Sequence, residues 1–188
     1  MKLKYIIPFF CISTLISNVN AATTEAQEKI QVLNVIKKFT ESVSCGTQPI
    51  SLKNIYTVER DIKYGRSTYY VLWFGNVGCD DGNASESFYI TEVYRGSGNR
   101  PFTVYAAFIE SSIYAFGDDI GINYRFIQDV KKINSKQFEI VSWKHADDKW
   151  GGKDGGSNFP ANKFKYTLEK VGYKGWKITN QVLLEQNK

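Results

Sequence analysis

Three stretches of this sequence combine acidic side chains with glycine: 78–83, 116–121 and 146–160. Clustered carboxylates and carbonyl oxygens from loops are the ligands that calcium takes in proteins. The stretches lack the spacing of an EF-hand, because Asp80 and Asp81 are adjacent and no Glu stands at the required final position. Turns also prefer Asp, Asn and Gly. We therefore predict turns here, expect no cofactor or metal, and keep a calcium-stabilised structural module as an alternative.

The stretch at 146–160 is our first candidate for a binding loop. A segment of this length without a helix or strand pattern is uncommon inside a compact domain and often has a function. It also carries a tryptophan, a residue type that dominates binding hot spots, although this side chain could instead cover one end of a sheet. The candidate binding residues are Asp147, Asp148, Trp150, Lys153 and Asp154, and a second candidate loop offers Asp80, Asp81 and Asn83.

Catalytic groups do not form a recognisable set. His145 is the only histidine, and a triad with Ser142 and Asp147 or Asp148 needs a geometry that sequence neighbours on a strand do not supply. A glycosidase needs two carboxylates about 5–10 Å apart across one cleft. The acidic residues in or beside predicted strands are Glu59, Asp61, Glu86, Glu92, Glu110 and Glu139. Their spacing singles out no pair, so we assign no catalytic residue and keep a cell-wall or glycan-active hydrolase as an alternative function.

Residues 1–21 have the layout of a secretory signal peptide. Lys2 and Lys4 precede an apolar run at 6–16 that is too short to span a bilayer, and a polar stretch leads to Ala21. We expect cleavage after Ala21, a single domain over 22–188, and a periplasmic or secreted location. No later run approaches the ~18 apolar residues of a membrane span.

Cysteine usage agrees with export. Cys11 leaves with the leader, so the mature chain keeps Cys45 and Cys79. An even pair in an oxidising compartment predicts a disulfide bond between them, with two free thiols as the alternative. The two residues do not form a C-x-x-C redox motif, and a single His beside bonded cysteines cannot build a structural zinc site.

The charge balance argues against a nucleic-acid partner. Loss of Lys2 and Lys4 with the leader lowers the formal net charge from +5 to +3, and the remaining basic residues are scattered along the chain. Because no catalytic set emerges, we expect an exported, non-enzymatic binding protein. A protein partner fits best, as for an immunity or inhibitor protein that neutralises a periplasmic enzyme or toxin. The sequence leaves the oligomeric state open.

The mature chain should begin with an amphipathic helix. Thr24 and Gln27 have the spacing of a capping box. The apolar stripe that follows has helical spacing and consists of Val32, Val35, Ile36, Phe39 and Val43. Gly46 suits the left-handed conformation that ends helices, so the pattern predicts Cys45 in the last helical turn.

Most of the remaining chain has strand patterns separated by Gly, Asn, Asp or Pro. The predicted strands are 54–62, 68–74, 87–95, 102–109, 123–133, 137–143, 163–171 and 175–184. The stretch at 124–133 also fits helical spacing, so a helix there is an alternative. The run at 69–74 is apolar on both sides, which predicts a central strand with both faces covered.

A helix followed by consecutive antiparallel strands indicates an α+β fold. We expect the N-terminal helix to pack on one strongly curved, mostly antiparallel sheet of about seven to eight strands, or on a partly closed barrel.

Overall fold

The computed structural model describes residues 23–79, 86–105, 114–117, 120–145, 160–172 and 175–186. Helix α1 (Glu25–Val43) is followed by two antiparallel sheets of five and four strands. The first sheet contains β1 (Ser44–Cys45), β2 (Ile55–Asp61), β3 (Arg66–Val77), β4 (Ser87–Arg95) and β5 (Thr103–Val104). The second sheet contains β6 (Ile127–Asn134), β7 (Gln137–His145), β8 (Pro160–Lys170) and β9 (Trp176–Gln186). The described residues also form the short 3-10 helices η1 (Leu52–Asn54), η2 (Tyr114–Phe116) and η3 (Tyr124–Phe126).

Helix α1 begins as its sequence predicts. The Thr24 side chain accepts a hydrogen bond from the Gln27 backbone N–H, and the Gln27 side chain accepts one from the Thr24 backbone N–H. The predicted stripe faces the first sheet, where Val32 and Ile36 are fully buried. Burial of this face, rather than helix propensity alone, stabilises the helix.

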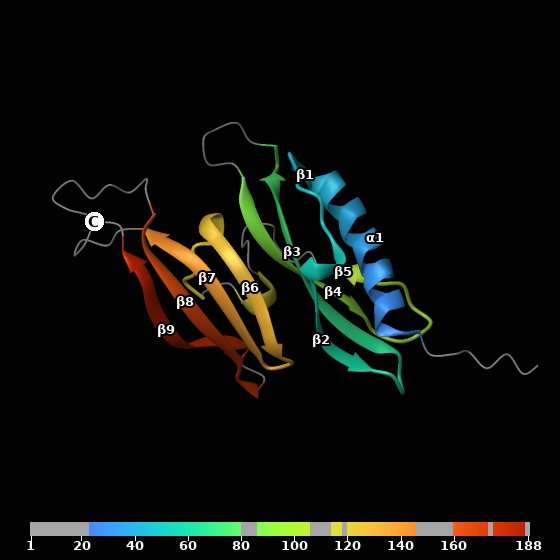
Figure 1. Cartoon of the computed structure of the whole chain (residues 1–188). Helices are drawn as coiled ribbons and strands as arrows, with labels where there is room; N and C mark the ends of the chain where they lie inside the picture. The colour runs from blue at the N-terminus through green and yellow to red at the C-terminus, as the bar shows by residue number, and fades with distance from the viewer. Residues whose placement is uncertain are drawn as a thin grey trace, which may run out of the picture.

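Strand β3 is the central strand of the first sheet, with both faces covered as predicted. Tyr69, Val71 and Trp73 belong to the core beneath α1, whereas Tyr70 belongs to the core between the two sheets and Leu72 packs against that second core. The first sheet is therefore the middle layer, between α1 and the second sheet (Figure 1). Alternation along the strand sends successive side chains into different cores.

Aromatic rings join the two sheets. The rings of Tyr70, Phe116, Phe138 and Trp176 contact one another, mostly edge to face, with centroids 5.2 to 6.1 Å apart. The indole N–H of Trp176 also donates a hydrogen bond of 2.9 Å to the Tyr70 hydroxyl. These contacts link β3 to the second sheet through side chains alone.

The expectation of one strongly curved sheet or a partly closed barrel is wrong. The α+β class and the antiparallel pairing are confirmed, but the described strands form two separate sheets, and neither is closed or strongly curled. Strand β5 pairs only with β4, and β6 pairs only with β7 among the described residues. The described residues between β5 and β6 form η2 and η3 instead of a connecting strand.

Two smaller expectations also change. The stretch predicted as a strand at 123–133, with a helix as the alternative, forms the short η3 helix and then strand β6. Of the strand predicted at 102–109, β5 forms at Thr103–Val104, and residues 106–109 lie outside the described part of the chain. The predicted signal peptide also lies outside the described residues.

The predicted disulfide bond between Cys45 and Cys79 is present, with a Cα–Cα distance of 5.2 Å. Cys45 does not lie in the last helical turn, because α1 ends at Val43 and Ser44 is already extended at a φ of −145°. Ser44 and Cys45 pair with Val77 and Asn76 of β3, so backbone hydrogen bonding draws the chain out of the helix. The bond therefore links β1 to the turn after β3.

Candidate functional site

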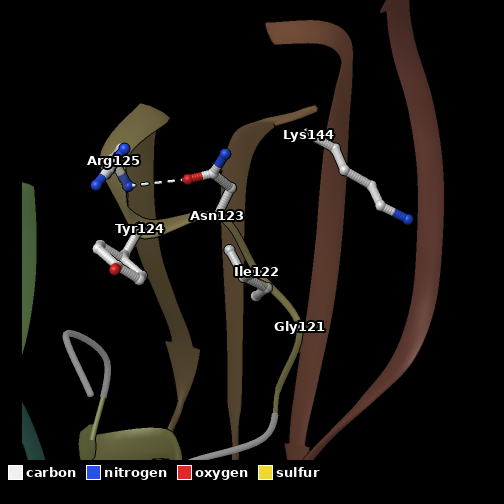
Figure 2. A pocket seen from close by; sticks show the side chains of 6 residues that line it. All are labelled: Gly121, Ile122, Asn123, Tyr124, Arg125 and Lys144. Carbon is white, nitrogen blue, oxygen red and sulfur yellow. Dashed lines mark hydrogen bonds between the residues drawn. The ribbon is translucent and has the colours of Figure 1, made fainter. Parts of the chain in front are cut away.

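An open groove of about 390 Å³ lies where the chain enters β6 and where β7 ends. Its lining residues are Gly121, Ile122, Asn123, Tyr124, Arg125 and Lys144. Figure 2 shows the side chains of Arg125 and Lys144 on opposite sides of Asn123. The lining thus combines one aliphatic side chain, an aromatic ring, an amide and two cations.

Local hydrogen bonds fix the segment that forms the groove. The Asn123 side-chain oxygen caps η3 by accepting from the Arg125 backbone N–H at 3.2 Å (Figure 2). The Ser142 hydroxyl on β7 donates to the Asn123 carbonyl at 2.5 Å. Ile122 is buried in the core between the sheets and anchors the segment from below. The groove is therefore built on a fixed turn, as precise binding requires.

The groove has a positive character. Arg125 and Lys144 are both exposed, and none of the six lining residues is acidic. Within the described ranges, neither cation forms an ion pair. The Asn123 amide nitrogen is buried without a hydrogen-bond partner, again among the described residues. The two exposed cations suit a carboxylate or another anionic oxygen group.

A second polar cluster surrounds Glu28, a residue that the sequence patterns did not single out. Its carboxylate accepts from Arg60 Nε at 2.9 Å and from Arg95 Nη2 at 2.5 Å. The Ser67 hydroxyl donates at 2.8 Å and the Tyr69 hydroxyl at 2.6 Å. One signal could have revealed it, because Glu28 precedes Val32 and Ile36 at the spacing of the buried helical stripe.

The pKa of Glu28 records this environment. Burial alone raises the pKa, but the hydrogen bonds from Arg60, Tyr69 and Ser67 outweigh burial and lower it to about 2. The carboxylate is therefore ionised, and only 2% of the residue is exposed. With its oxygens fully engaged and no access for a ligand, this cluster holds α1 on the first sheet.

In the strand registers, none of the described carboxylates considered for hydrolysis lies directly opposite another. The strand registers place Glu59 opposite Thr68, Asp61 opposite Arg66, Glu92 opposite Tyr70, and Glu139 opposite Lys131 and Thr167. Glu86 is exposed outside the strands, and Glu110 lies outside the described residues.

Among these carboxylates, Glu92 has an unusual environment. Burial raises its pKa, and the nearby Lys170 partly counteracts this effect. A raised pKa is what a general acid needs. However, the described residues offer no second carboxylate opposite it, so Glu92 by itself does not make a glycosidase site.

The loop residues predicted for binding all lie outside the described residues. They are Asp80, Asp81 and Asn83 in one stretch and Asp147, Asp148, Trp150, Lys153 and Asp154 in the other. The stretch at 146–160 begins two residues after Lys144 in the sequence, and Lys144 is one of the residues that line the groove. The groove itself was missed, because a single Asn, Tyr and Arg before a strand form no recognisable motif.

The described residues contain no group of three or more His, Cys, Asp or Glu side chains that could hold a metal ion. They also contain no helix long and apolar enough to cross a membrane.

The chain was compared with protein-family models, with curated proteins and with solved structures, and none of them matches it.

Proposed function

We propose that this chain is an exported, non-enzymatic binding protein that recognises another protein through its basic groove. An immunity or inhibitor protein acting on a periplasmic enzyme or toxin fits this description. The observation that carries the proposal is the pair of exposed cations, Arg125 and Lys144, beside a preformed groove without acidic lining. The periplasmic location rests on the leader-like residues 1–21.

The groove chemistry favours an acidic surface on the partner. Opposite charges accelerate encounter and exclude partners of the wrong sign. An arginine provides a planar donor fork that matches a carboxylate, while a lysine provides a mobile point charge. Tyr124 adds an aromatic side chain, a type that contributes strongly to protein interfaces. A partner Asp or Glu side chain seated between Arg125 and Lys144 is the simplest occupant.

The candidate residues of 146–160 come directly after β7 in the sequence. This stretch contains Trp150 and several charged residues. We therefore include the candidate residues of 146–160 in the proposed binding region. Trp150 is of a residue type that commonly anchors protein interfaces.

The test is a capture experiment with charge-reversed variants. The purified protein is immobilised, exposed to periplasmic extract at low salt, and the retained proteins are identified by mass spectrometry. Arg125→Glu and Lys144→Glu should each reduce recovery of a specific partner, and the double variant should abolish it. The isolated partner is then tested for activity, which the wild-type protein should inhibit.

A matched control separates the groove from overall charge. Arg100→Glu makes the same charge change at an exposed position in the loop between β4 and β5. This variant should recover the partner as well as the wild type does. Equal recovery by all variants would show that the groove does not bind the partner. Recovery of no partner at all would refute the binding function.

A further inference from the structure

One of the two edge strands of the second sheet, β9, carries three consecutive exposed apolar residues. Strand β9 pairs with β8 and has no other strand partner among the described residues. Figure 1 shows β9 at the outer side of the second sheet, away from the first. Val182, Leu183 and Leu184 on this strand are 40%, 50% and 49% exposed. Open sheet edges invite pairing with another strand.

Soluble proteins usually protect such an edge with prolines or charged residues. Strand β9 contains no proline, and its only charged residues are Lys177 and Glu185. Its pairing with β8 skips Thr179 and Leu184, which marks two bulges, and is regular between them over 180–183. Three consecutive exposed apolar residues on an edge are unusual unless they have a function.

The two charged residues of β9 are self-complementary. Lys177 and Glu185 lie at equal distances along the strand on either side of Gln181. The register with β8 places Lys177 opposite Glu169 and Glu185 opposite Lys163, and both β8 residues are on the same face of that strand. Lys177 and Glu185 therefore share one face of β9 and carry opposite charges.

We propose that the occupant of this edge is β9 of a second copy of the chain. A two-fold axis through Gln181 sets the two β9 strands antiparallel. Lys177 of one copy then lies opposite Glu185 of the other, and Glu185 of the first copy lies opposite Lys177 of the second. The second sheets of the two copies then join into one continuous sheet across the axis. Such a closed, symmetric contact uses the same patch on both subunits.

The charges of neighbouring strands extend this complementarity. Lys163 Nζ lies 3.7 Å from a Glu185 carboxylate oxygen within one copy. On the outer face, Lys163 and Glu185 of one copy are followed across the axis by Lys177 and Glu169 of the second copy. Opposite charges therefore meet at the new interface. The same register sets the exposed Leu183 opposite Thr179 and Leu184 opposite Ile178. A strand from an unrelated protein would need the same charge order.

Sedimentation of the disulfide-bonded protein from about 1 to about 100 µM tests the inference, a range that detects micromolar affinity. The expected species is a dimer. Lys177→Glu and Glu185→Lys should each weaken self-association about tenfold, because each places two like-charged pairs at the interface. A mixture of the two single variants should recover wild-type association, because their opposite charges then meet. A monomer throughout the range would overturn the proposal.

Cross-linking fixes the register independently. Opposed residues in an antiparallel pair have Cα atoms about 4.5–5.5 Å apart, which a disulfide bond can span. Gln181→Cys should therefore form a covalent dimer on mild oxidation, because the axis sets this position against itself. Thr179→Cys is the matched control and should stay monomeric in the denaturing gel. Equal cross-linking of both variants, or of neither, would contradict this register.

Discussion

At the level of single residues, Glu28 is the most constrained charged group of the described structure. Two arginines, a serine and a tyrosine saturate a carboxylate that is almost fully buried. Arg95, itself 6% exposed, also lies over the Phe102 ring at 4.5 Å. Charges in such places are tolerated only when each has its partner. The cluster therefore determines where α1 sits on the sheet as much as the apolar stripe does.

Glu28→Gln should strongly destabilise the protein. The substitution keeps the shape of the side chain but leaves Arg95 buried without a counter-charge, which should cost about 3–5 kcal/mol of unfolding free energy. Urea unfolding followed by tryptophan fluorescence measures this loss. Glu25→Gln is the control, because Glu25 is 50% exposed and its ion pair with Lys29 is on the surface. That change should cost less than about 1 kcal/mol.

The free energy of unfolding should also depend on pH through Glu28. Its pKa is about 2 in the folded protein against an ordinary value of 4.5. A pKa that folding lowers adds stability that is complete above the unfolded value and lost as the pH falls toward the folded value. Between pH 4.5 and 2 the wild type should lose about 3 kcal/mol that Glu28→Gln does not lose. Parallel pH profiles of the two proteins would count against this role of Glu28.

At the level of elements, the turn between β2 and β3 touches the loop after β4. Gly65 has a φ of +64°, and a Cβ at this position would lie 2.4 Å from the Gly98 Cα atom. The Gly98 N–H also donates to the Tyr64 carbonyl at 3.2 Å. Neither the backbone conformation nor the available space admits a side chain at Gly65.

Gly65→Ala should therefore lower the unfolding free energy by about 1–3 kcal/mol through backbone strain and overpacking. Gly96→Ala, in the same neighbouring loop, is the matched control, because its Cβ would meet no atom within 4 Å. Its effect should stay within about 0.5 kcal/mol. Thermal unfolding of both variants measures the contrast, and similar melting temperatures would show that the two loops separate easily.

The disulfide bond joins β1, just after α1, to the turn that follows β3. It closes a loop with a sequence separation of 34 residues. The loop-entropy model assigns such a bond roughly 3–4 kcal/mol. Replacement of Cys45 and Cys79 by Ser together should lower the unfolding free energy by up to this amount, while far-ultraviolet circular dichroism stays unchanged. A changed spectrum would mean that the bond also determines the fold.

The sequence predicted correctly those elements whose pattern lies within one continuous stretch of the chain. The capping box at Thr24, the stripe of α1 and the two-sided burial of 69–74 needed no knowledge of distant residues. The role of Glu28 could be predicted only with knowledge of distant residues, because its partners Arg60 and Arg95 lie 32 and 67 residues away along the chain. A charge within an apolar stripe resembles a surface residue until those partners are known.

For the whole molecule, the sequence pattern gave the faces of the strands but not the number of sheets. Period-2 alternation tells which side chains are buried together, and it does not tell which strands pair at an edge. The break between β5 and β6 therefore could not be read from the residues. The groove shares this difficulty, because Asn123–Arg125 meets Lys144 only when β6 and β7 pair.

The two-sheet arrangement makes the stability of the second sheet depend on its contact with the first. Helix α1 and the first sheet have their own core around Val32, Tyr69 and Trp73, whereas the core of the second sheet is shared through Tyr70 and Trp176. Loss of the shared contact should therefore affect the two sheets unequally.

Trp176→Ala tests this dependence. Trp176 is 7% exposed and contacts three aromatic rings, so its removal should cost about 3–5 kcal/mol. In native-state hydrogen exchange, amides of β6–β9 should lose protection before those of β3 and β4, because α1 still covers the first sheet. Trp176→Phe is the control: it keeps most apolar contact and removes the bond to Tyr70, at about 1 kcal/mol. An equal loss of protection in both sheets would instead show that the molecule unfolds as one cooperative unit, with the inter-sheet core governing the helix layer as well.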